Sequence, residues 1–339
     1  MLALAWYVVL ALVGTAVVWT ASDWLETSAD RLSAYYGLPA IVQGALVVAV
    51  ASSFPELTTA VVAPLIHGEF DLGVGAIIGS AIFNVLVIPG LATTFSPGAL
   101  NVNRDVVYKE AQFYFVSIAV FLLMCSFAVI YYPVENGVSG TITPVLAAIP
   151  IGTYLLYLFI QYEDTIEHDA PDVSGIAPAT QWAYMLVSLA AILFGVEALV
   201  RAAIGFGNAF GTPSFVWGLT VVAAATSLPD AFVSVTAAKR DHDVTSIANV
   251  LGSNVFDLLV AVPAGVIVAS AVTTEAVAVD FAVVVPLIAV LVLATVALFA
   301  FLRTDLELAS WEPWTLLGLY LAFLLWLTLE SLGLTGVLV

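Results

Sequence analysis

Two stretches of the chain, residues 37–56 and 211–230, decide the fold because they repeat one pattern. The first reads GLPAIVQGALVVAVASSFPE and the second reads GTPSFVWGLTVVAAATSLPD. Further along, GSAIFN at 79–84 matches GSNVFD at 252–257. The offset is 174 residues at the first block and 173 at the second, so one residue was lost in the turn between them. The sequence therefore predicts two related halves.

The composition around these blocks places the chain in a membrane. Hydrophobic residues make up 62% of the 339 positions and charged residues only 9%, whereas a soluble domain carries roughly 25% charged residues. Uncharged apolar runs recur that are long enough to cross a bilayer of about 30 Å as helices. The first run has no basic residue ahead of it, which predicts a retained helix rather than a signal peptide. The predicted helices are 2–21, 38–66, 70–95, 107–132, 142–162, 180–204, 213–238, 243–271, 277–301 and 312–334.

These ten helices predict an all-α integral membrane protein built as two inverted five-helix repeats. A polar linker, 163–179, separates a first repeat (1–162, motif region 37–96) from a second (180–339, motif region 211–272). An odd number of helices per repeat makes the second half enter the membrane from the opposite side, as in many secondary transporters.

The distribution of basic residues predicts the orientation. With both termini outside the cell, one basic residue, Arg201, lies outside, and the others lie in cytoplasmic loops with the linker, as the positive-inside rule requires of a plasma-membrane protein. The cytoplasmic residues would be Arg31, Arg104, Lys109, Lys239, Arg240 and Arg303.

The charge balance excludes one class of partner. The chain has 25 acidic and 7 basic residues, and without a basic patch it is not expected to bind nucleic acid. The acidic excess suggests a prokaryotic, haloarchaeal source. We interpret the acidic part of the linker as a solvated loop and the single cysteine, Cys125, as a packing residue.

Ionisable residues deep in membrane helices are functional candidates. Glu56 and Asp230 occupy equivalent places in the second and seventh predicted helices, and Asn84 and Asp257 in the third and eighth. A purely structural alternative is a protonated carboxyl group that joins helices by hydrogen bonds, and for Asn84 alone this alternative is nearly as attractive as cation binding.

The neighbours of these residues favour cation binding. Pro55 and Pro229 directly precede the two carboxylates and should deprive the carbonyls of Ala51 and Ala225 of their helical hydrogen bonds. Freed carbonyls that line a cavity can coordinate cations. Hydroxyl groups on the same helix faces add further oxygens: Ser52, Ser53, Ser80, Thr226, Ser227 and Ser253. Glycines at 75, 79 and 252 are expected to let the third and eighth helices approach closely.

The predicted site contains carboxylate, amide, hydroxyl and carbonyl oxygens without sulfur or imidazole. Such a donor set suits calcium and sodium rather than zinc or copper. His67, His168 and His242 fall at predicted loops and are expected to be solvated. Three carboxylates in a low-dielectric region must be neutralised by bound cations or protons, and this requirement couples ion binding to movement.

The paired blocks resemble the two alpha-repeats of the sodium/calcium exchanger family, within the calcium:cation antiporter superfamily. The family pattern Gly-Thr-Ser-x-Pro-Glu/Asp, then Gly-Ser-Asn-x-Phe-Asn/Asp, corresponds here to ASSFPE (51–56) with GSAIFN, and to ATSLPD (225–230) with GSNVFD. The resemblance implies a sodium/calcium antiporter that works by alternating access, with the first and sixth helices sliding past the other eight, without a cofactor and as a monomer.

The resemblance also implies roles for individual residues. Glu56 and Asp230 would be central ligands for calcium and sodium, with Asn84 and Asp257 beside them. The six hydroxyl residues would add oxygens, and the carbonyls of Ala49 and Ala223 would serve outlying sodium sites.

Several residues depart from the family pattern. Alanine replaces glycine at 51 and 225, and Ala76 and Ala81 stand where asparagine is common. Asp230 and the Phe-Asp ending at 257 resemble potassium-dependent members, so potassium co-transport stays open. Proton/calcium exchangers carry a glutamate in the third- and eighth-helix motifs, and 75–84 and 248–257 contain none, which disfavours proton coupling without excluding it.

Two other classes of membrane protein, a channel and an intramembrane protease, fit the sequence less well than an exchanger. A channel needs a continuous pore, and oppositely oriented kinked helices argue against one. An intramembrane aspartyl protease could use Asp230 and Asp257, but the pairing of each with a counterpart in the other half favours ion binding. The chain is therefore not expected to be an enzyme.

Overall fold

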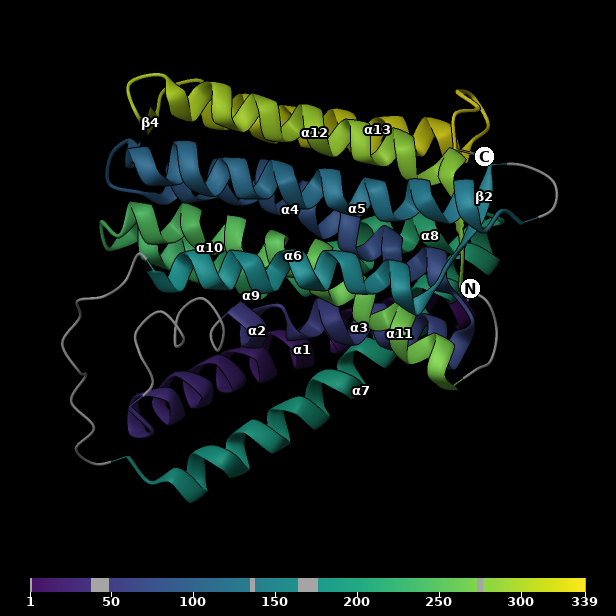
Figure 1. Ribbon diagram of the computed structural model, residues 1–339, viewed down its shortest axis with the longest axis horizontal. Coiled ribbons are helices and arrows are strands. Elements are labelled where there is room, and N and C mark those ends of the chain that lie inside the picture. The colour runs from purple at the N-terminus through teal and green to yellow at the C-terminus, as the bar shows by residue number, and fades with distance from the viewer. Residues whose placement is uncertain (1, 38–48, 135–137, 164–175, 273–276, 339) are drawn as a thin grey trace.

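The protein is a bundle of long membrane helices with both chain ends at the same end of the bundle (Figure 1). The computed structural model describes residues 2–37, 49–134, 138–163, 176–272 and 277–338. Its helices are α1 (Leu2–Tyr35), α2 (Ala49–Ser52), α3 (Phe54–His67), α4 (Phe70–Phe95), α5 (Ala111–Tyr131), α6 (Pro144–Glu163), α7 (Pro178–Phe210), α8 (Ser214–Trp217), α9 (Ala223–Lys239), α10 (Asp243–Phe256), α11 (Val262–Val272), α12 (Phe281–Arg303) and α13 (Glu312–Ser331). Three π-helical turns extend α5, α9 and α10: η2 (Asp105–Glu110), η3 (Gly218–Val222) and η4 (Asp257–Ala261).

The described residues contain nine helical segments long and apolar enough to cross a membrane. Seven of the ten predicted spans agree closely with helices of the structure, and α4 begins and ends as predicted. Much of the predicted second helix, 38–66, lies outside the described residues, so the count of ten stays a prediction. The multi-pass, all-α fold class is confirmed.

The first helix is longer than predicted. The span 2–21 ended at the first polar cluster, but α1 continues to Tyr35 because Leu25, Ala29 and Leu32 recur on one buried face while Asp23 and Asp30 face outward. A polar face opposite an apolar stripe is an ordinary amphipathic helix. The sixth helix is likewise longer, since α7 ends at Phe210 rather than 204.

Two short antiparallel strand pairs join the halves. The sequence analysis did not predict these strands. β1 (Leu100–Asn101) pairs with β4 (Glu307–Leu308), and β2 (Ser139–Ile142) pairs with β3 (Val277–Asp280). Residues 277–280, predicted to begin the ninth helix, therefore form a strand. β2 and β4 lie at opposite ends of the bundle (Figure 1) although both precede the last helix of their half. Equivalent loops at opposite ends are the mark of an inverted repeat.

α4 lies at the centre of the bundle. Its most apolar window is entirely buried, which agrees with a helix that is apolar on every face. α1 and α7 lie together along one edge (Figure 1) and cross where a Cβ atom at Gly14 would lie 2.8 Å from the Gly195 carbonyl oxygen. The bundle thus consists of a packed core around α4 and a peripheral pair of long helices.

Candidate ion-binding site

The predicted polar residues meet where the repeat-related segments cross, at the middle of the bundle. α3 and α9 carry Glu56 and Asp230, and α4 and the α10/η4 segment carry Asn84 and Asp257. α4 packs against α9, α3 against η4, and α10 against both α2 and α9. The carboxylates, amide and hydroxyls predicted from the sequence are at most 2% exposed: Ser52, Ser53, Glu56, Ser80, Asn84, Thr226, Ser227, Asp230, Ser253 and Asp257.

Hydroxyl groups from the two halves hydrogen-bond to one another across the crossing. Ser80 Oγ lies 2.7 Å from Ser227 Oγ and donates to Glu56 Oε1 at 3.5 Å. Ser52 Oγ lies 3.4 Å from Ser253 Oγ. The structure therefore brings these four hydroxyl groups of the predicted set together in two pairs, one beside Glu56 and the other beside Asp230.

Amide groups form a second set of contacts on the other side of the crossing. Asn84 Nδ2 donates to Asp230 Oδ2 at 3.3 Å and to Asn254 Oδ1 at 3.0 Å. The Asn254 amide donates to the Tyr114 hydroxyl at 3.0 Å and to the Ala81 carbonyl at 3.3 Å. This network fixes the amide of Asn84 so that its oxygen stays free.

Six buried oxygens at the crossing have no hydrogen-bond partner among the residues that the structure describes. An unpaired buried acceptor costs about 1–3 kcal/mol, so native proteins rarely leave so many together. A bound cation or a proton would satisfy them, and an all-oxygen set is what calcium and sodium prefer. The six atoms are Ser53 Oγ, Glu56 Oε2, Asn84 Oδ1, Asp230 Oδ1 and both carboxylate oxygens of Asp257.

The three carboxylates repel one another but do not converge on one point. Glu56 feels the charges of Asp230 and Asp257, and Asp257 feels that of Asp230. Even so, among the described residues no three His, Cys, Asp or Glu side chains are grouped closely enough to hold one metal ion. The three carboxylates alone therefore do not form one metal-binding group, and the amide, hydroxyl and carbonyl oxygens beside them would have to complete any cation site.

The backbone is interrupted differently in the two halves. In the first half the helix breaks at Ser53, between α2 and α3, where φ is −89° and ψ is 11°. In the second half α9 runs unbroken through Pro229, although a proline has no N–H to donate to the Ala225 carbonyl. The irregularity comes earlier, at η3, and π-turns of this kind often occur at functional sites.

The predicted carbonyl ligands lie beside these irregularities. The Ala223 carbonyl directly follows η3 and accepts a 3.3 Å hydrogen bond from Thr226 Oγ1. Ala49 is the first residue of α2. Their role as sodium ligands stays a prediction.

Two of the three predicted glycine contacts are made, but with a different partner. A Cβ atom at Gly79 would lie 2.1 Å from the Leu219 carbonyl oxygen, and one at Gly75 would lie 2.9 Å from that of Phe215. Both glycines therefore bring α4 against η3 and α8. At Gly252 no described residue lies within 4 Å of a Cβ atom placed there, so the described part of the chain makes no close contact at that glycine, contrary to the prediction.

Sequence reasoning missed three polar residues near the site and one ion pair. Asn254 stands inside the GSNVFD block, and its place in that repeated block could have identified it as a site residue. No comparable sequence feature marks Tyr114 or Glu26. His67 was expected to be solvated, but it is the last residue of α3 and binds Glu197 at 2.9 Å. His168 lies outside the described residues, and His242 lines a cavity.

Comparison with known protein families gives one match that spans most of the chain. The model described as sodium/calcium exchanger protein matches residues 6–163 and 180–329. The two matched segments are separated by the polar linker between the halves.

Individual relatives and solved structures agree with this match. An uncharacterized membrane protein of Methanocaldococcus jannaschii is 29% identical over 73% of this chain and 77% of its own length. The sodium/calcium exchanger MaX1 of Methanosarcina acetivorans is 23% identical over 92% of this chain and 96% of its own.

Two solved structures share the fold. The sodium-calcium exchanger NCX_Mj superimposes with a TM-score of 0.61 at 22% identity, over 94% of this chain and 98% of that one. An H⁺/Ca²⁺ exchanger, CAX, gives a TM-score of 0.75 at 15% identity, over 94% and 82%.

Proposed function

This chain belongs to the sodium/calcium exchanger family, and from that premise we propose that it exchanges sodium for calcium across the cell membrane by alternating access. Membership makes it a multi-pass membrane exchanger of calcium for another cation. That the second cation is sodium, and that the net result is calcium extrusion, is the proposal. The buried oxygens at the crossing of the two repeats that have no partner among the described residues carry it, since a bound cation would satisfy them and neutralise the carboxylates.

We assign the roles within the site from its geometry. Glu56 and Asp230, one from each repeat, would bind calcium and sodium in turn, and Asp257 and Asn84 would complete the adjacent positions. The serine and threonine hydroxyls and the carbonyls of Ala49 and Ala223 would supply the neutral oxygens that sodium requires. Calcium brings two charges and several sodium ions bring a comparable charge, so either load can neutralise the same carboxylates.

The peripheral pair would move in this mechanism. α1 and α7 lie outside the core, and the two strand pairs tie together loops of the core alone. Sliding of α1 and α7 against the core would expose the site to one side of the membrane at a time. The positive-inside rule places both termini outside the cell.

Flux measurements in proteoliposomes test the proposal. Vesicles loaded with sodium and diluted into sodium-free buffer should accumulate radioactive calcium, and Glu56→Gln should abolish this uptake. Asp305→Asn is the matched control: Asp305 is exposed and has a left-handed backbone that asparagine also tolerates.

The same vesicles separate the alternatives. Uptake that needs no sodium and follows a pH gradient would replace the proposal with calcium/proton exchange. Uptake that also requires potassium in the external buffer, on the same side as the calcium, would indicate potassium-dependent exchange. Unaltered uptake by Glu56→Gln would refute the assignment of the site.

A further inference from the structure

An acidic residue occupies the same place on the two peripheral helices. α1 and α7 both end at a left-handed glycine, Gly37 with φ 64° and Gly211 with φ 67°. Asp23 and Glu197 stand at the same distance before these glycines, within uninterrupted helices. Because the two repeats are inverted, these equivalent acidic residues lie toward opposite ends of the bundle.

A side chain able to carry positive charge occupies the same place after the two core helices. His67 ends α3 and precedes Gly68, whose φ is 68°. Arg240 follows α9 and precedes Asp241, whose φ is 59°. Each repeat thus supplies one acidic group from a peripheral helix and one basic group from the end of a core helix.

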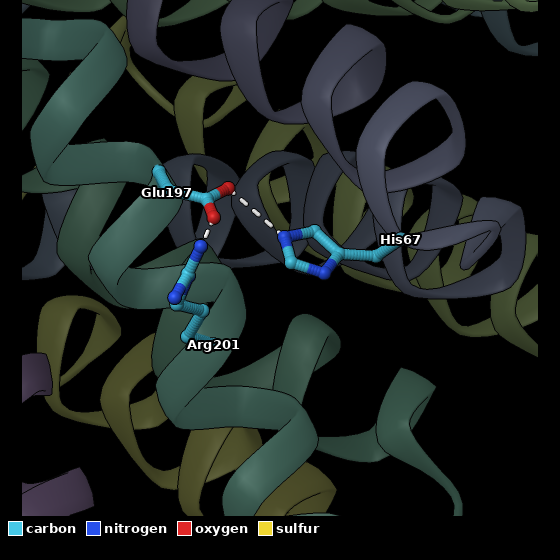
Figure 2. A network of polar contacts seen from close by, with 3 residues as sticks. All are labelled: His67, Glu197 and Arg201. Carbon is cyan, nitrogen blue, oxygen red and sulfur yellow. Dashed lines mark hydrogen bonds and ion pairs between the residues drawn. The ribbon is translucent and has the colours of Figure 1, made fainter.

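At the end of the bundle that holds the chain termini, the acidic and basic groups are joined. Glu197 Oε2 lies 2.9 Å from His67 Nε2, and Glu197 Oε1 accepts from Arg201 Nε at 2.5 Å (Figure 2). Nearby, the Ser214 hydroxyl donates to Glu69 at 2.5 Å. The contact between Glu197 and His67 joins α7 to the end of α3, the helix that carries Glu56.

At the opposite end the equivalent groups are separated by space. Asp23 and Arg240 both line a cavity of about 590 Å³ between α1 and α9. Among the described residues no ion pair joins the two, although such a pair is found at the other end. Glu26 lines the same cavity and is close enough to Asp230 to feel its charge, so the acidic lining of the cavity lies near the ion site.

α1 and α7 diverge from the core toward the end of the bundle at which α7 begins (Figure 1). The acidic cavity between α1 and α9 lies at this end. A cavity of about 430 Å³ between α8 and α13 has no acidic residue among its described lining residues. Of these two cavities, the acidic one is therefore suited to cations.

We propose that Glu197–His67 and Asp23–Arg240 are two alternating gate contacts, of which one is closed and the other open in this structure. Sliding of α1 and α7 against the core would part Glu197 from His67 and bring Asp23 to Arg240. The four residues act as positioning residues, since they set which end of the ion site is accessible. This inference rests on alternating access as proposed above, but not on which cation is exchanged.

Disulfide cross-linking between paired cysteines tests the two contacts. In a Cys125→Ala background, which removes the buried native thiol, one variant carries His67→Cys with Glu197→Cys and another carries Asp23→Cys with Arg240→Cys. Cross-linking rates are measured in calcium, sodium, potassium and ion-free buffers. Thr141→Cys with Ala278→Cys, paired across β2 and β3 in the core, is the control whose rate should not respond to ions.

The two rates should change in opposite directions, each by about threefold or more, between the conditions that favour one end and the other. In the Asp23/Arg240 cysteine variant, His67→Ala should raise the rate, and His67→Arg, which restores a cation beside Glu197, should not. Rates that rise and fall together, or an Asp23–Arg240 cross-link that never forms, would overturn the inference. Opposed rates without any sodium-driven flux would preserve it and reject the proposed cation instead.

Discussion

Replacing Asp230 with asparagine should weaken calcium binding much more than sodium binding. The substitution keeps the shape of the side chain and an oxygen that can accept from Asn84 Nδ2, now 3.3 Å from Asp230 Oδ2. It removes one negative charge from a group that is 1% exposed. The electrostatic loss is proportional to the charge of the ion, so it should be twice as large for calcium as for sodium.

The magnitude follows from the burial of the site and from its other charges. Two unit charges about 4 Å apart interact by about 4 kcal/mol at an effective dielectric constant of about 20. The net loss is smaller than this figure for either ion, and in proportion to the charge of the ion, because the other oxygens of the site screen the interaction. We expect a net loss of about 1.5 kcal/mol for sodium and about 3 kcal/mol for calcium, or roughly tenfold and a hundredfold in affinity.

Calorimetric titration of the purified protein with each ion measures both affinities. Asp305→Asn is the control for loss of a surface charge and should change neither. An equal loss for the two ions would show that Asp230 acts through geometry rather than charge. Unchanged calcium affinity would refute its place in the site.

Three further substitutions test the packing around the site. Gly79→Ala should destabilise the protein by about 1–3 kcal/mol, because its Cβ atom would lie 2.1 Å from the Leu219 carbonyl oxygen, whereas Gly252→Ala should cost little because that position has free space. Thermal unfolding in detergent compares the two, and equal melting temperatures would contradict the close approach of α4 to η3. Tyr114→Phe removes the acceptor of a 3.0 Å hydrogen bond from Asn254; it should cost about 1 kcal/mol of stability and reduce calcium affinity less than threefold in the same titration. A larger loss of affinity would mean that the Tyr114 hydroxyl is needed at the site itself.

Much of the fold could be predicted because the signals were strong and local. α4 was delimited correctly since its apolar run lies between Glu69 and the Ser96-Pro97-Gly98 turn. The predicted first helix ends at residue 21, before the acidic residues Asp23, Glu26 and Asp30. The spacing of these three residues leaves one face of the helix for apolar residues, so α1 continues to Tyr35. The strand pairs could not be predicted, since each strand is short and its partner lies in the other half of the chain.

The candidate site was predicted from the internal repeat rather than from single residues. Equivalence between the halves singled out Glu56 with Asp230 and Asn84 with Asp257, and the structure brings all four to one crossing. The two halves are not equivalent everywhere. The helix is interrupted at Ser53 in the first half, but α9 continues through Pro229 in the second. No described residue lies close to a Cβ atom placed at Gly252. Tyr114 was missed because a lone tyrosine in an apolar helix carries no sign of its partner.

The two strand pairs have a mechanical consequence for the whole molecule. The β1–β4 and β2–β3 pairs connect loops of one half to loops of the other at opposite ends of the bundle. They therefore hold the core helices together at both ends. A movement that separated the two halves would have to break the hydrogen bonds of one strand pair. A conformational change through α1 and α7 would break neither, because the loops that the strand pairs connect belong to the other helices.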